Sequence, residues 1–171
     1  MADETPNAAD KPEAGATPAL NIVGQYIRDL SFENPGAPAS VVLGNGNPEF
    51  NVSINVGVRK QADELYAVEL NMSARAERDK QLLFNIELVY GGLFRVRGVP
   101  EAELPMVLMI ECPRQIFPFA RQVLASTTQA GGFPPLLMEP VDFIQLYRQN
   151  VAAMAAAQSQ ANAEGGSGSV N

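Results

Sequence analysis

The sequence predicts an α+β fold of two layers: a four-stranded antiparallel sheet, followed by two main helices packed on one of its faces. Two observations predict it. Apolar and polar residues alternate through four segments between residues 21 and 96, which is typical of strands with one buried face. After Gly98, apolar residues recur at helical spacing instead. Short turns between the later strands favour an antiparallel meander in the sheet.

The first strand is expected from about Asn21 to Glu33. Pro35 and Pro38 follow it closely, and proline cannot continue a strand ladder, so a long crossover loop is expected before the next strand. This crossover distinguishes the first strand from the three that follow.

Alternation along the first strand predicts the face on which each side chain lies, because residues two apart share a face. We expect Tyr26, Leu30 and Phe32 on one face, and Asp29 and Glu33 on the other. The two carboxylates are then roughly 13 Å apart at the rise of a strand, which is too far for an acid/base pair. The spacing suits an acidic surface on which a basic protein surface docks.

Three more strands are expected. Alternation without a miss places the second over Phe50–Val58, and the third follows over Leu65–Glu77. The fourth is expected over Gln81–Tyr90 and resumes over Leu93–Val96. The pair Gly91–Gly92 between these two parts is interpreted as a bulge or a sharp bend.

The helices are expected after these strands. A short helix over Glu101–Cys112 is predicted to end at a proline, which suits the first turn of a longer helix over Pro113–Ala130. Asp142 is the expected N-cap of a last helix that reaches about Ala156.

Length and composition favour one domain over residues 20–157. The chain has 171 residues, of which 46% are hydrophobic, enough for a core. Residues 1–19 are rich in Ala, Asp, Glu, Pro and Thr, and residues 158–171 are rich in Gly, Ser and Ala. Both ends are therefore interpreted as disordered tails.

Charge and hydropathy limit the partners. With 12 basic and 19 acidic residues, the net charge of −7 argues against nucleic acid and favours basic protein partners. No apolar run approaches the ~20 residues of a membrane-spanning helix, and the start of the sequence lacks the pattern of a signal peptide. We expect a cytoplasmic protein that does not insert into membranes.

The residues that the sequence lacks limit its chemistry. It has no His and one cysteine, Cys112, which excludes His-based triads, His metal sites, CxxC redox sites and an internal disulfide. No glycine-rich phosphate loop is present either. We therefore expect no catalytic residues, metal or cofactor, and Cys112 is expected to be a buried structural thiol.

The chain carries more apolar surface than one sheet face can cover. The segment Phe133–Met138 cannot be regular because of its prolines, yet it is strongly apolar for a surface loop. The last helix is apolar around most of its circumference. Such surface is expected to bury against sister subunits, to line a groove for an apolar partner, or both.

Four motifs in register point to a family. They are Arg28–Pro38, Gly91–Phe94, Cys112–Arg121 and the pair Gly132–Leu136 with Pro140–Phe143. In order and spacing over roughly residues 20–150, they resemble the bacterial protein-export chaperone SecB family. Any one motif would be weak, but four in register are specific.

The resemblance implies an ATP-independent holdase chaperone that assembles as a homotetramer, a dimer of dimers. Such a chaperone binds unfolded secretory precursor proteins, keeps them translocation-competent and delivers them to the translocation ATPase SecA. By position, the resemblance implies that the SecA-binding acids are Asp29, Glu33 and Glu87. The implied client-binding groove is lined by Phe50, Val52, Ile54, Phe133, Leu137, Met138, Leu146 and Tyr147.

Other interpretations stay open. From the residues alone, Asp29 and Glu33 fit an ordinary solvated sheet face, and the apolar side of the second strand fits an ordinary core. One alternative function is a SecB-like chaperone specialised for a toxin–antitoxin system. Another is a thioesterase-like enzyme that uses a carboxylate such as Glu87, although that fold usually places a helix early in the chain, and here both long helices come last.

Overall fold

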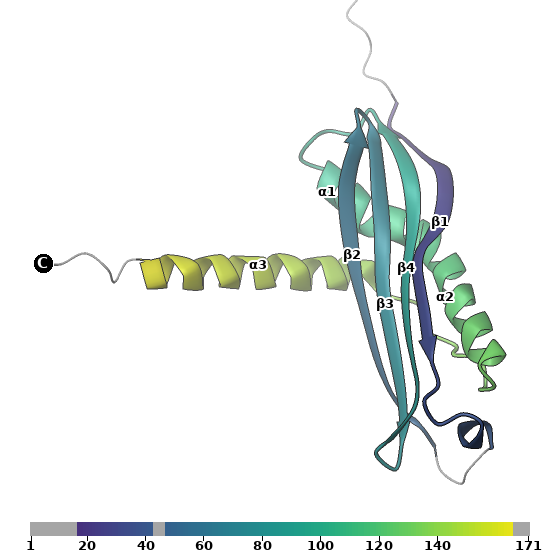
Figure 1. Ribbon diagram of the computed structural model, residues 1–171. Coiled ribbons are helices and arrows are strands. Elements are labelled where there is room, and N and C mark those ends of the chain that lie inside the picture. Colours follow the sequence, from purple (N-terminus) through teal and green to yellow (C-terminus); the bar gives the residue numbers. More distant parts are fainter. Residues whose placement is uncertain (1–16, 43–46, 166–171) are drawn as a thin grey trace, which may run out of the picture.

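The computed structural model describes residues 17–42 and 47–165 of the chain (Figure 1). The four strands are β1 (Ala19–Glu33), β2 (Glu49–Ala62), β3 (Leu65–Arg78) and β4 (Gln81–Arg97). They form one sheet in the order β1-β4-β3-β2, and every neighbouring pair is antiparallel. Strands β2 to β4 form a meander, and β1 adds to the outer edge of β4, which confirms the predicted fold class.

The glycine pair in β4 is not a bulge, so that prediction was wrong. β4 stays paired with β3 at both Gly91 and Gly92, and it runs without interruption to Arg97. The glycines are needed because other side chains lie directly over them. A Cβ atom on Gly91 would overlap the ring of Tyr26, and one on Gly92 would overlap Phe94.

The bulges lie in β1 instead. Its register against β4 shifts between Ile22 and Gly24 and again between Ile27 and Asp29, so Arg28 is an extra residue in the ladder. The second shift reverses the alternation of faces. Tyr26 consequently lies on the same face as Asp29, and the prediction that grouped Tyr26 with the apolar residues was wrong.

Helices cover one face of the sheet (Figure 1). None of the helices in the described residues covers the other face, which we call the open face. Leu30 and Phe32 pair with Leu88 and Ile86 of β4 and share their helix-covered side. Asp29 and Glu33 alternate with them and lie on the open face, as predicted.

The helical part begins with α1 (Leu104–Met106) and a π-helical turn, η2 (Val107–Glu111), and continues directly into α2 (Cys112–Ala130). A break between two helices was expected at Pro113. Instead, the wide π turn just before the proline accommodates its missing N–H, and the helical path continues. At its other end α2 stops at two glycines, of which Gly132 has a φ of +90°.

The core lies between α2 and the central strands β3 and β4 (Figure 1). The fully buried side chains that form its centre come from both layers; they are Val68, Leu70, Ile86, Leu88, Phe94, Ile116 and Leu124. Cys112 is also fully buried, as predicted.

The last helix, α3, runs over Phe143–Gly165 and has the expected N-cap. The Asp142 Oδ1 atom accepts hydrogen bonds of 3.0 Å from the backbone N–H groups of Ile144 and Gln145. Phe143 is buried against Phe117, with ring centroids 5.8 Å apart, and fixes the start of α3 to the core.

Beyond its first turns α3 extends away from the sheet (Figure 1). It continues past the expected end at Ala156, so the segment from residue 158, expected to be a tail, begins inside the helix. The expectations for residues 1–16 and 166–171 lie outside the described residues. No helix in the described part of the chain is both long and apolar enough to cross a membrane.

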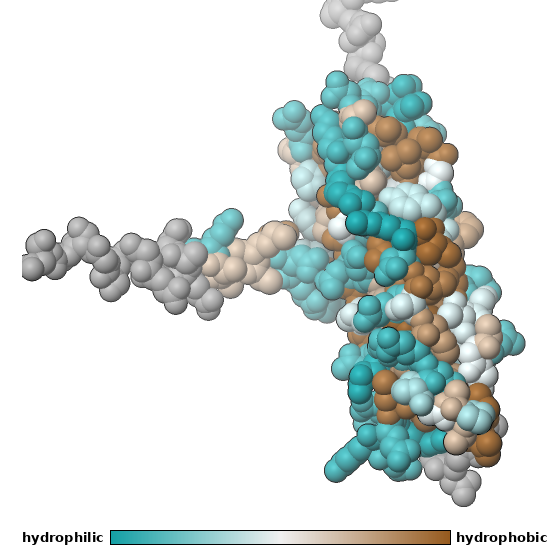
Figure 2. All heavy atoms as spheres, viewed as in Figure 1, coloured by the Kyte–Doolittle hydropathy of each residue, from teal (hydrophilic) through white to brown (hydrophobic). Residues whose placement is uncertain are grey.

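Large apolar side chains remain exposed, as the sequence predicts. Figure 2 shows hydrophobic residues along the β1 side of the molecule, beside the hydrophilic surface over β2 and β3. On β1 the exposed apolar residues are Ile22, Val23, Ile27 and Leu30. One protomer therefore leaves apolar surface available for other chains.

Candidate functional site

An apolar groove of about 640 Å³ opens between the starts of β2 and β4 and the loop that joins α2 to α3. We call it the client groove, because the resemblance implies that residues of its lining bind client segments. Strand β2 contributes Phe50 and Val52, and β4 contributes Leu83 and Phe84. The remaining wall is Pro48 together with the loop residues 133–139.

Aromatic rings form the floor of this groove. The Phe84 ring centroid lies 5.0 Å from that of Phe133, 5.7 Å from Phe32 and 6.4 Å from Phe50. Phe50 is half exposed, so the cluster continues from the core to the surface. Aromatic faces of this kind accept apolar side chains of varied shape.

The loop is fixed to the end of α2 by hydrogen bonds. The Phe133 N–H donates to the carbonyl oxygen of Thr128 at 3.1 Å, and the Leu136 N–H donates to the Thr128 Oγ1 atom at 2.9 Å. Its prolines restrict the backbone further. The apolar side chains of the loop are therefore held at the surface with little backbone freedom.

The structure brings together five of the eight residues expected in the groove: Phe50, Val52, Phe133, Leu137 and Met138. The other three, Ile54, Leu146 and Tyr147, do not line it, and they pack half-buried against the core. Ile54 lies further along β2, beyond the groove. The first turns of α3 contact the π turn η2. Leu146 and Tyr147 on these turns pack against the core, outside the groove.

Sequence reasoning missed the contribution of Leu83 to the groove. The pairing of β3 with β4 shifts between Ala76 and Glu77, and this shift leaves Leu83 without a partner in β3. A run of three apolar residues, 82–84, breaks the strand alternation there and was the available signal.

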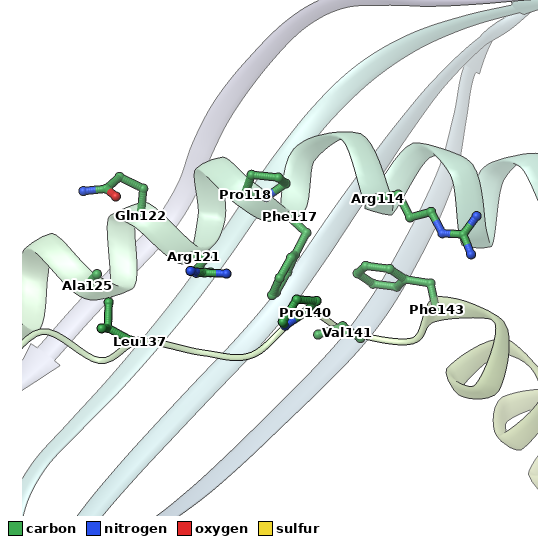
Figure 3. A pocket seen from close by; sticks show the side chains of 10 residues that line it. All are labelled: Arg114, Phe117, Pro118, Arg121, Gln122, Ala125, Leu137, Pro140, Val141 and Phe143. Carbon is green, nitrogen blue, oxygen red and sulfur yellow. The ribbon is translucent and has the colours of Figure 1, made fainter.

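A second apolar cavity of about 500 Å³ lies between α2 and the loop that leads to α3. Figure 3 shows Phe117 pointing from α2 toward Pro140 of the loop, beside Phe143, with Arg121 nearby. Leu137 lines this cavity as well as the client groove, and its exposed fraction is 71%. An extended apolar segment could therefore contact both cavities across Leu137.

The three predicted docking acids are all exposed on the open face. Asp29 and Glu87 line the same shallow hollow of about 200 Å³, together with polar side chains of β2 and β3. Glu33 lies outside this hollow, at the end of β1. Among the ion pairs of the described residues, none includes any of the three acids, so their charges are available to a partner.

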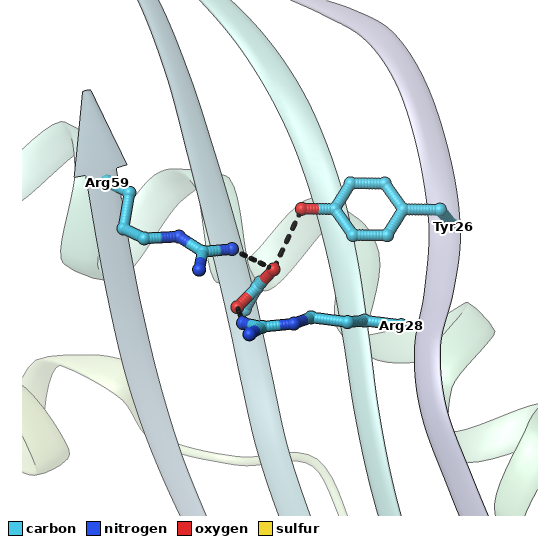
Figure 4. A network of polar contacts seen from close by, with 4 residues as sticks. Tyr26, Arg28 and Arg59 are labelled. Carbon is cyan, nitrogen blue, oxygen red and sulfur yellow. Dashed lines mark hydrogen bonds and ion pairs between the residues drawn. The ribbon is translucent and has the colours of Figure 1, made fainter. Parts of the chain in front are cut away.

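Next to these acids lies a polar cluster that the sequence did not predict. The Glu69 side chain of β3 is only 8% exposed. Its carboxylate accepts hydrogen bonds from Tyr26 Oη at 2.9 Å, Arg28 Nη1 at 2.9 Å and Arg59 Nη2 at 2.6 Å (Figure 4). Burial, and then the bond to Glu69, raise the pKa of the Tyr26 hydroxyl.

Little in the described chain suits nucleophilic or metal chemistry. Burial, with a smaller effect of nearby Glu111, raises the pKa of the Cys112 thiol to about 12, so the thiol stays protonated near neutral pH. No group of three or more Cys, Asp and Glu side chains within residues 17–42 and 47–165 could hold a metal ion.

Known proteins are similar in sequence to this chain over most of its length. The family model of SecB, the preprotein translocase subunit, matches residues 13–154. The protein-export protein SecB of Bradyrhizobium sp. BTAi1 is 51% identical over 147 residues, covering 86% of this chain and 91% of the relative. That of Rhodopseudomonas palustris BisB5 is 50% identical over 144 residues, covering 84% and 91%.

A solved structure shares the fold at much lower identity. It is a SecB-like chaperone of Mycobacterium tuberculosis in complex with a ChAD peptide from the HigA1 antitoxin. Its TM-score is 0.59 and its identity 15%, and the match covers 72% of this chain and 91% of that one.

The family match includes all four strands, α2 and the first turns of α3. It therefore covers the client groove and the open face together, and it confirms the resemblance that the four sequence motifs indicate. The relatives are protein-export proteins, and this chain is a preprotein-binding export chaperone. The chain belongs to the SecB family.

Proposed function

We propose that this protein is an ATP-independent holdase that captures unfolded secretory precursors in the client groove and delivers them to SecA through the acids of its open face. One observation carries the proposal. The groove and the three acids lie on opposite faces of one sheet. A bound precursor therefore leaves the docking acids uncovered, so client and SecA can be bound at the same time.

The chemistry of the groove suits extended apolar segments of a client. Its walls are aromatic, aliphatic and proline side chains, and Glu139 is its one charged lining residue among those described. Burying ~400 Å² of apolar surface contributes on the order of 10 kcal/mol before the costs of ordering the client. Individual contacts are then weak, and Met138 adds a flexible side chain suited to varied sequences.

Assembly as a homotetramer, a dimer of dimers, would strengthen capture. A long unfolded chain that reaches several grooves binds each later one intramolecularly, which raises the overall affinity without new contacts. The exposed apolar residues of β1 and of the outer surface of α2, such as Phe119, support burial between protomers. We place this assembly in the cytoplasm, where precursors await export.

Docking through Asp29, Glu33 and Glu87 would depend on charge. Exposed carboxylates attract a basic partner surface and orient it, which mainly raises the association rate. The attraction weakens as salt screens the charges. SecA binding should therefore weaken with ionic strength more than client binding does.

The alternatives have less support. The relatives that are about 50% identical are protein-export proteins, whereas the antitoxin-bound chaperone shares only the fold. For a thioesterase-like enzyme, Glu87 would need an enclosed substrate pocket, but it lies in a shallow polar hollow. We therefore infer a binding protein and not an enzyme.

The experiment mixes the protein, without nucleotide, with the unfolded and the folded form of one secretory precursor and measures binding by calorimetry. Capture of the unfolded form alone supports the holdase, and equal binding of both forms overturns it. SecA binding is then measured for the triple variant Asp29→Asn, Glu33→Gln, Glu87→Gln. We expect client capture to stay unchanged while SecA binding falls.

A matched control separates docking from net charge. The variant Asp63→Asn, Glu101→Gln, Glu103→Gln removes the same number of exposed acids from outside the open-face hollow. It should bind SecA as the parent protein does. If both triple variants lose SecA binding equally, the three acids are not a specific docking site.

A further inference from the structure

Strand β1 is anchored at two places, which lie on opposite faces of the sheet. On the open face, Tyr26 and Arg28 bind the Glu69 carboxylate. On the helix-covered side, the Phe32 ring packs on Phe84 and lies so close to Gly131 that a Cβ atom there would overlap it. The first anchor is polar and spans three strands, and the second is part of the aromatic cluster.

A regular strand could not satisfy both anchors. Tyr26 and Phe32 are six residues apart, and an even separation puts two side chains on the same face. The extra residue at Arg28 changes this parity, so that Tyr26 lies over Gly91 and Phe32 lies in the core. The bulge is therefore required by the two anchors together.

The bulge also determines where Asp29 points. Asp29 is the first residue after the shift, and it lies directly opposite Val89 on the open face. If the bulge moved along β1, Asp29 would be the first of the three acids to leave that face. Glu33 follows the anchored Phe32, and Glu87 belongs to β4.

We propose that Glu69 is a positioning residue for the docking face: by holding Tyr26 and Arg28 it keeps the bulge at Arg28 and so keeps Asp29 beside Glu87. The inference rests on the proposed function, because the position of Asp29 matters only if the acids dock SecA. Arg59 of β2 completes the cluster, since it bonds to the same carboxylate from the other side. Without that carboxylate, two guanidinium groups and a hydroxyl lose their shared acceptor.

A disulfide reporter tests the geometry without SecA. Residues 29 and 89 are directly opposite, so the pair Asp29→Cys, Val89→Cys should form a cross-strand disulfide on oxidation, while the native Cys112 is buried. We expect Glu69→Gln to lower the yield at least about threefold as the register loosens. The control pair Ser31→Cys, Glu87→Cys lies next to the Phe32 anchor and should cross-link equally in both backgrounds.

SecA binding tests the consequence. Glu69→Gln should weaken it roughly threefold to tenfold, as expected for a misplaced charge at an interface. The effect should not add to that of Asp29→Asn, because a charge that has been removed cannot be misplaced, but it should add to that of Glu87→Gln. Glu77→Gln, which removes a more exposed carboxylate from the same strand, is the control and should have little effect.

The outcomes separate the two proposals. An unchanged disulfide yield in Glu69→Gln, or full additivity with Asp29→Asn, overturns the positioning role. If Asp29→Asn does not weaken SecA binding, the docking proposal fails, while the disulfide yields still show whether Glu69 determines the position of residue 29.

Client capture should be unchanged in Glu69→Gln, which shows that the fold is intact. If Glu69→Gln does not fold, Tyr26→Phe removes one bond of the same anchor and should shift both readouts in the same direction.

Discussion

The Oγ1 atom of Thr128 accepts a 2.9 Å hydrogen bond from the backbone N–H of Leu136, although the Thr128 side chain is fully buried in α2. The same hydroxyl lies 3.0 Å from the carbonyl oxygens of Leu124 and Ala125, to which it can donate its proton. One buried hydroxyl thus connects the helix of the core to the loop that walls the client groove.

Replacing Thr128 by valine keeps the shape of the side chain but removes this acceptor. The Leu136 N–H then loses its partner, so the free energy of unfolding should fall by about 1–3 kcal/mol. The loop should also loosen and client affinity should fall. Chemical denaturation and calorimetry with an unfolded precursor measure the two effects. Thr127→Val, one residue away and with a side chain that is not hydrogen-bonded to the loop in the described structure, is the control. Equal losses in both variants would contradict the prediction.

Leu137 should contribute to client capture and little to stability, because its exposed fraction is 71% and it borders both apolar cavities. We expect Leu137→Ala to weaken binding of an unfolded precursor by roughly threefold to tenfold, because the shorter side chain buries less apolar surface of the client. The thermal midpoint should change little. Met154→Ala removes a side chain of similar exposure, 67%, from the projecting part of α3. It should not affect binding to the groove, and an equal loss there would show that general surface hydrophobicity is responsible.

An alanine at position 91 should destabilise the sheet, because its Cβ atom would overlap the Tyr26 ring. Displacing that ring strains β1, and we expect a loss of about 1–3 kcal/mol in the free energy of unfolding, measured by denaturant titration. Gly24→Ala is a matched control in β1, since a Cβ atom there meets nothing within 4 Å. The prediction fails if the two variants are equally stable.

The Cys112 thiol should make stability depend on pH in the alkaline range. Its pKa rises from 9.0 to about 12 on folding, so the folded state keeps a proton that the unfolded state loses. The stabilisation is complete below pH 9 and is lost as the pH rises toward 12, by up to about 1.4 kcal/mol per pH unit.

Urea titrations between pH 8 and pH 10.5 should therefore show a steeper decline for the parent protein than for Cys112→Ala. Tyr26 and Tyr90, whose pKa values are also raised, contribute equally to both proteins. Parallel curves would contradict the prediction. In the native protein at pH 8, the thiol should also resist alkylation until the chain unfolds.

The periodicity of apolar residues predicted most of the fold, because it reflects which side of each strand or helix is buried, and this is a local property of the chain. Each strand has one side facing the helical layer, so apolar residues alternate along it. Asp142 caps α3 through atoms only two and three residues away. The break expected at Pro113 did not occur, because the π turn before it absorbs the missing hydrogen bond. That adjustment leaves no periodic signal in the sequence.

The candidate site was predicted in part for the same reason. Phe50 and Val52 could be assigned to the groove by position, and Phe133, Leu137 and Met138 by their apolar character in an irregular loop. Leu146 and Tyr147 were expected in the groove but lie outside it, because the direction of α3 depends on how the Phe143 ring packs against Phe117.

The sequence alone determined the order of strands and helices along the chain and the apolar side of most of them. It also determined the surplus of apolar surface and, through four motifs in register, the family. Only the tertiary structure decided which side chains of β1 share a face. A bulge forms where two anchors require opposite parity, and those anchors, Glu69 on one side and Phe84 on the other, lie far from β1 in the sequence. A local sequence pattern cannot predict contacts between residues so far apart in the chain. The role of Glu69, to which we assign the placement of Asp29, could therefore be inferred only from the folded sheet.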